Sequence, residues 1–218
     1  METSQTGYEG QPDFSEMLSK AGAKVTAREL KSYLRGMLGA PRLVPQPEVF
    51  KNVVFAGAQP RLDSAEELER LLMAFMYFWD DVASNRLEQG MFRHPADEYP
   101  PTTAGLRKRI IDTYREVAAF LRGLTDGEIV LEALPPQGRE AHAAVVDVEQ
   151  HLSNYVTALG ESDLPQEEIP EVVKVLDQFD ETLDLLMVSL GIAMETARRE
   201  ALLSEKPPIS GDSNAPAD

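Results

Sequence analysis

The sequence predicts an all-α protein of about six helices, packed around a buried central helix at residues 64–88 and flanked by disordered termini. Three observations lead to this fold class. Apolar residues recur at spacings of three and four over long segments, as on one face of a helix. Helix-forming residues dominate and runs of β-branched residues are short. Capping residues, glycines and prolines separate the segments.

The first residues carry no apolar period. Residues 1–12 are therefore expected to be disordered, and the next few residues to form one short helical turn. A firm helix is expected after Thr26, because Thr26 and Glu29 have the spacing of a capping box. Gly39 and Pro41 are typical of its end. A turn-rich connector follows, with a short helix expected around residues 48–55.

The central helix at 64–88 is the clearest in the chain. Ser64 and Glu67 have the spacing of a second capping box. Met73, Tyr77 and Phe78 lie off its main apolar stripe, so the helix is apolar on several faces and is expected to be buried on several faces. The main stripe comprises Leu68, Leu71, Leu72, Phe75, Met76, Trp79, Val82, Ala83 and Leu87.

Three more helices are expected, at about 104–121, 139–159 and 170–204. Gly123 is interpreted as the stop of the first of them. The connector at 123–138 is a candidate sub-boundary within a single helical domain that spans 1–204. Residues 205–218 are rich in Pro, Ser, Gly and Asp and are expected to form a disordered tail.

Composition narrows the classes of function. The net charge of −16 argues against binding to nucleic acid or anionic lipid and permits a basic protein partner. With no cysteine, the chain has no thiolate zinc site and no cysteine nucleophile. No signal peptide and no membrane-spanning run are visible. The cytoplasm is the expected location, and the oligomeric state is open.

The first half resembles the bacterial YecA/YgfB-like family over about residues 26–100. The matching segments are ELKSYLRGMLGAP, LVPQPEVFKNVVFAG and LDSAEELERLLMAFMYFWDDVASNRL. Lys31 and Ser32 stand where the family usually has His-Gly. The resemblance implies an all-α fold and a protein without an established enzymatic activity. Several relatives end in a Cys-rich zinc-binding tail, which a chain without cysteine cannot form.

The strongest candidate site is an acidic stripe on the last helix. Its members recur at i, i+3, i+4 and i+7, and therefore share one face. Like charges at this spacing repel one another, so the stripe is read either as a solvated face, as a surface for a basic protein, or as a metal site. Its residues are Asp177, Asp180, Glu181 and Asp184.

The aromatic residues Phe75, Phe78 and Trp79 are read either as core or as the lining of an apolar ligand pocket. The basic run at 107–109 is expected to pair with acidic faces of the same protein rather than with phosphate. No catalytic residue, metal ligand or cofactor is assigned. We expect an interaction or regulatory protein without catalysis; the alternatives are a metal-dependent all-α hydrolase and a helical protein that binds an apolar small molecule.

Overall fold

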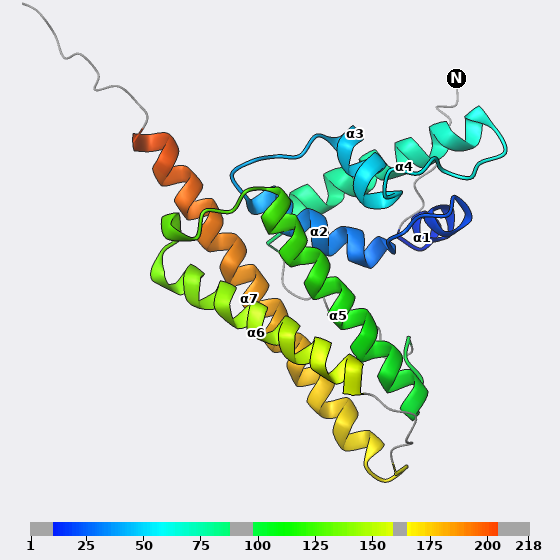
Figure 1. Ribbon diagram of the computed structural model, residues 1–218, viewed down its shortest axis with the longest axis vertical. Helices are drawn as coiled ribbons and strands as arrows, with labels where there is room; N and C mark the ends of the chain where they lie inside the picture. Colours follow the sequence, from blue (N-terminus) through cyan, green and yellow to red (C-terminus); the bar gives the residue numbers. More distant parts are fainter. Residues whose placement is uncertain (1–10, 88–97, 159–164, 205–218) are drawn as a thin grey trace, which may run out of the picture.

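The computed structural model describes residues 11–87, 98–158 and 165–204 (Figure 1). Within these residues the chain forms helices and no strand, which confirms the all-α fold class. The predicted disordered segments at the two termini lie mostly outside the described residues. The helices are α1 (Gln11–Lys20), α2 (Ala27–Gly39), α3 (Gln46–Glu48), α4 (Ala65–Asn85), α5 (Thr103–Asp126), α6 (Pro136–Ala158) and α7 (Ile169–Ser204).

Two short helical segments of other types complete the described fold. A π-helix at Val49–Val54 continues α3, and a 3-10 turn at Leu131–Ala133 joins α5 to α6. α1 is longer than the single turn predicted from the sequence. None of the described helices is long and apolar enough to cross a membrane.

The local signal at the start of α2 acts as predicted, and that at the start of α4 does so in part. The Thr26 side chain accepts a hydrogen bond from the Glu29 backbone N–H, and the Glu29 carboxylate accepts one from the Thr26 N–H. Ser64 caps α4 by accepting from the Glu67 N–H. The Glu67 carboxylate accepts from the Asp63 N–H rather than from that of Ser64, so the second capping box is shifted by one residue.

The most extensive helix contact is the crossing of α2 and α5, which is visible near the upper end of α5 in Figure 1. Here glycines bring the two backbones together. A Cβ atom on Gly36 would lie 2.3 Å from the Phe120 carbonyl oxygen, and one on Gly123 would lie 2.1 Å from that of Tyr33. No side chain fits between the helices at either point, so glycine is required for this packing distance.

The predicted helix stop at Gly123 is therefore wrong. α5 continues through Gly123 to Asp126, and Gly123 is buried within it. Glycine inside a helix costs about 1 kcal/mol relative to alanine. The close backbone contact with α2 offsets this loss of helix stability. Because the contact joins distant parts of the chain, the local sequence does not reveal it.

The buried apolar residues form two clusters. One joins α1, α2, the π-helix and α4, and the other joins α5, α6 and α7. In Figure 1 the second group forms an elongated bundle, and α2 links the two groups by crossing α5. The predicted sub-boundary near 123–138 lies within the span of the second cluster and stays a prediction.

α4 forms where the central helix was predicted, but it is buried along one face. That face comprises Leu71, Ala74, Phe75, Phe78, Trp79 and Val82. On the rest of the helix, Leu72, Met73, Met76 and Tyr77 are 38–47% exposed. The expectation of burial on several faces is thus corrected, because α4 packs against α1 and α2 and its opposite side meets solvent.

Candidate functional site

The acidic stripe of α7 does not form one solvated surface. Asp177 and Glu181 are exposed, whereas Asp180 and Asp184 are each only 3% exposed. Their helical spacing was read correctly, but α7 turns two of the four carboxylates into the protein. The predicted use of all four residues to bind a basic partner is therefore not available in this structure.

The buried members of the stripe pair with arginines of the same chain. The Arg109 guanidinium of α5 lies 2.5 Å from the Asp180 carboxylate and 2.8 Å from that of Asp177. Arg35 of α2 lies 3.5 Å from Asp184. Burial raises the pKa of Asp180, an effect that the adjacent Arg109 opposes. The stripe thus joins α7 to α5 and α2. The basic run at 107–109 was predicted to pair with acidic faces of the same protein, and Arg109 does so.

A second buried ion pair links α2 to α5. Arg28 donates to Glu116 over 2.8 Å and to Glu98 over 2.7 Å. Glu116 is 3% exposed, and burial raises the pKa of its carboxyl group to about 7, although Arg28 opposes the rise. Sequence reasoning missed Glu116, because an acidic residue in a mixed-charge helix gives no sign that it faces another helix.

The other charged candidates do not gather into a site. Lys108 pairs with Asp112 one helical turn away and lies over the Tyr99 ring. In the described part of the chain, no group of three or more His, Asp or Glu side chains is arranged to hold a metal ion.

Phe75, Phe78 and Trp79 are all buried and contact other aromatic rings. Phe78 packs against Phe14 of α1 with ring centroids 4.7 Å apart. Phe75 packs against Phe50 at 5.2 Å and against Trp79 at 6.0 Å. These rings fill the first hydrophobic cluster, and none of them lines the groove described next.

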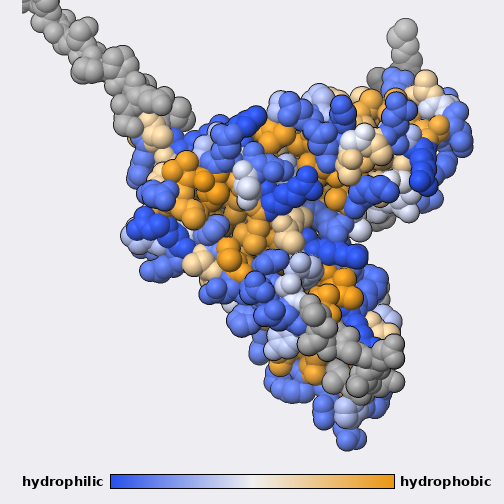
Figure 2. Space-filling view, in the orientation of Figure 1, coloured by the Kyte–Doolittle hydropathy of each residue, from blue (hydrophilic) through white to orange (hydrophobic). Residues whose placement is uncertain are grey.

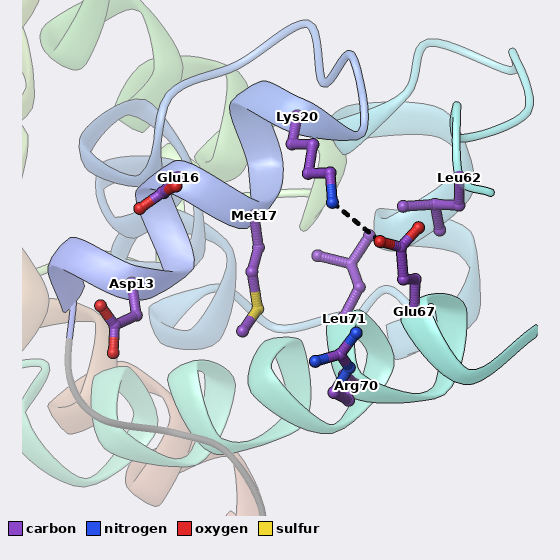
Figure 3. Close-up of a pocket in the computed structure, with 8 residues that line it drawn as sticks. All are labelled: Asp13, Glu16, Met17, Lys20, Leu62, Glu67, Arg70 and Leu71. Atoms are coloured by element: carbon purple, nitrogen blue, oxygen red, sulfur yellow. Dashed lines mark hydrogen bonds and ion pairs between the residues drawn. The ribbon is translucent and has the colours of Figure 1, made fainter. Parts of the chain in front are cut away.

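An open groove of about 440 Å³ runs between α1 and α4 (Figure 3). This volume lies within the range of known ligand sites, about 300–1,000 Å³. Met17 reaches from α1 toward α4, and the Lys20–Glu67 ion pair, 2.8 Å long, bridges the two helices. We call this the α1–α4 groove; its lining is Asp13, Glu16, Met17, Lys20, Leu62, Glu67, Arg70 and Leu71.

Two exposed apolar residues of α4, Met73 and Tyr77, lie next to this groove, and Leu72 and Met76 lie farther round the helix. Met73 and Tyr77 follow Arg70 by three and seven residues, so they continue the same side of the helix away from the groove. Figure 2 shows apolar residues at several places on the near surface of the upper part of the molecule, between hydrophilic ones. We define the α4 outer face as Leu72, Met73, Met76 and Tyr77. In the sequence, Met73 and Tyr77 lie off the main apolar stripe and Leu72 and Met76 belong to it, and burial was expected for all four.

Comparisons with known proteins bear on the fold alone. No family model matches the chain, and no curated protein matches it. The chain is similar in structure to the lpg0076 protein from Legionella pneumophila, whose crystal structure superposes with a TM-score of 0.55. The two sequences are 16% identical, and the match covers 85% of this chain and 96% of the Legionella chain. The similarity supports the helical architecture.

Proposed function

We propose that this protein acts by binding another protein, without catalysis, and that the α4 outer face is the contact surface. The observation that carries the proposal is the exposure of four large apolar side chains on adjacent turns of one helix. Single exposed apolar residues are ordinary, but a contiguous group beside a groove is typical of interaction sites. The cytoplasm remains the proposed location.

The composition of this face also favours protein binding. Full burial of an exposed Leu, Met or aromatic side chain contributes about 1.5–3 kcal/mol. Because these four are 38–47% exposed, a partner that covers them gains less than half of that for each. Met73 and Met76 are flexible and polarisable, and methionine adapts to the shape of a bound surface. The resemblance of the first half to the YecA/YgfB-like family is consistent with a non-enzymatic role, and that membership remains a proposal.

The proposal is tested by affinity capture from a lysate of the source cell. The wild-type protein is compared with a variant that carries Met73→Ser and Tyr77→Ser. Both substitutions remove exposed apolar surface and leave the buried face of α4 unchanged. We expect at least one stoichiometric partner to bind the wild-type protein and to be lost from the variant.

A matched control carries Leu185→Ser and Ile192→Ser on α7. These two side chains are each 51% exposed and belong to a different helix. The control should retain the partner. If the α4 variant and the control capture the same proteins in the same amounts as the wild-type protein, the proposed contact surface is wrong.

A further inference from the structure

The two helices that form the groove are acidic, although their two basic side chains, Lys20 and Arg70, both line it. α1 and α4 together carry seven carboxylates and two basic side chains. Of these carboxylates, only Glu67 forms an ion pair with another described residue, and its partner Lys20 is one of the two bases. The other six are Asp13, Glu16, Glu66, Glu69, Asp80 and Asp81.

The fold restricts how a protein segment binds here. The described residues contain no strand, so they offer no sheet edge to which an extended peptide could add. Two packed helices with an open groove between them suit a third helix, whose apolar stripe has residues at i, i+3, i+4 and i+7. Met17 in the groove and Met73 and Tyr77 beside it supply the apolar contacts.

From this juxtaposition of apolar contacts in and beside the groove with an excess of carboxylates, we infer that the partner presents a basic amphipathic helix. Its apolar residues contact Met17, Met73 and Tyr77, and its Lys and Arg side chains meet Asp13, Glu16 and Glu69. This inference rests on the proposed function and names the kind of partner. The excess of carboxylates repels nucleic acid and anionic lipid, because both carry the same sign of charge.

The test uses synthetic helical peptides with the full-length protein. A fluorescent Leu/Lys peptide of about 18 residues carries Leu at i, i+3, i+4 and i+7. A second peptide replaces every Lys with Glu, and a third scrambles the Leu/Lys order. Fluorescence anisotropy gives the Kd of each. We expect the patterned Leu/Lys peptide to bind at least about tenfold more tightly than either control, and more weakly at high salt, because salt screens exposed charges.

Charge alone draws a basic peptide to a protein of net charge −16, so the site needs a matched pair of variants. Glu16→Lys with Glu69→Lys reverses two exposed carboxylates, one that lines the groove and one on the α4 turn before Met73. Glu140→Lys with Glu171→Lys reverses two exposed carboxylates on α6 and α7, with the same change in net charge. The first variant should weaken binding about tenfold relative to the second. Circular dichroism confirms that both variants retain their helices.

Equal weakening by the two variants, or equal binding of the three peptides, overturns the inference. The proposed function is judged separately by the lysate capture. If the Met73→Ser, Tyr77→Ser variant loses a cellular partner but the Leu/Lys peptide does not bind, the α4 outer face is an interaction surface for another kind of partner. If the Leu/Lys peptide binds and the Glu16→Lys, Glu69→Lys variant weakens its binding more than the control variant does, the inference is supported independently of the lysate capture.

Discussion

Replacement of Gly123 by alanine should destabilise the protein, although alanine is the better helix former. Gly123 lies inside α5 at the crossing with α2. An added Cβ would lie 2.1 Å from the Tyr33 carbonyl oxygen and 2.9 Å from the Met37 backbone nitrogen. Both atoms belong to the α2 backbone, which cannot rotate away as a side chain can. The two helices must therefore separate by about 1 Å at their closest contact.

The expected magnitude follows from two opposing effects. Overpacking of a well-packed interior costs about 1–3 kcal/mol, and occasionally more. The higher helix propensity of alanine returns about 1 kcal/mol. Because the clash is with backbone and the crossing is the most extensive helix contact of the fold, we expect the upper part of the range. The net loss should be about 2 kcal/mol, which lowers the Tm by about 4–8 °C in a protein of this size.

The assay is urea denaturation followed by circular dichroism, with Gly191→Ala as the matched control. Gly191 also lies inside a long helix, but its added Cβ would meet only the Leu87 Cδ2 methyl group, at 2.8 Å. That methyl group can move, so the control should be neutral or slightly stabilising. If Gly123→Ala is as stable as the wild-type protein, or if Gly191→Ala loses as much stability, the crossing does not depend on glycine as described.

Three further predictions concern the buried charges and the two sides of α4. Because burial raises the pKa of Glu116 from 4.5 to about 7, its folded form binds a proton more tightly than its unfolded form. Stability should therefore fall as pH rises from about 4 to about 8, by up to about 3 kcal/mol, and Glu116→Gln should remove this component in urea titrations at several pH values. Asp184→Ala leaves the Arg35 guanidinium buried without this carboxylate and should lower the free energy of unfolding by about 3–5 kcal/mol. Replacement of both residues by Leu should recover most of this loss. A double variant as unstable as the single one would argue against the ion pair. Trp79→Ala should lower the free energy of unfolding by about 3–5 kcal/mol. Leu72→Ala, at an exposed position, should change it by less than about 1 kcal/mol. If thermal melts show similar losses of stability for the two variants, the one-sided burial of α4 is contradicted.

The helices could be located from the sequence because their signals are local. The Thr26–Glu29 capping box joins groups three residues apart, and the apolar period of α4 repeats within each turn. Such patterns depend on backbone geometry that every helix shares. The all-α class and the extent of α4 and α7 follow from them with little reference to the rest of the chain.

The candidate site could not be located in this way, because its character depends on contacts between distant residues. Arg109 meets Asp180 across 71 positions in the chain, and this contact turns half of an acidic stripe into interior ion pairs. Likewise, the periodicity of α4 shows that several faces are apolar but not which of them finds a neighbour. Met73 and Tyr77 remain at the surface because α1 and α2 cover the opposite side of α4, and Gly123 continues a helix because α2 passes over it. Local sequence specifies the shape and chemistry of each helix surface, whereas the packing of helices against one another selects which surfaces meet protein and which meet water.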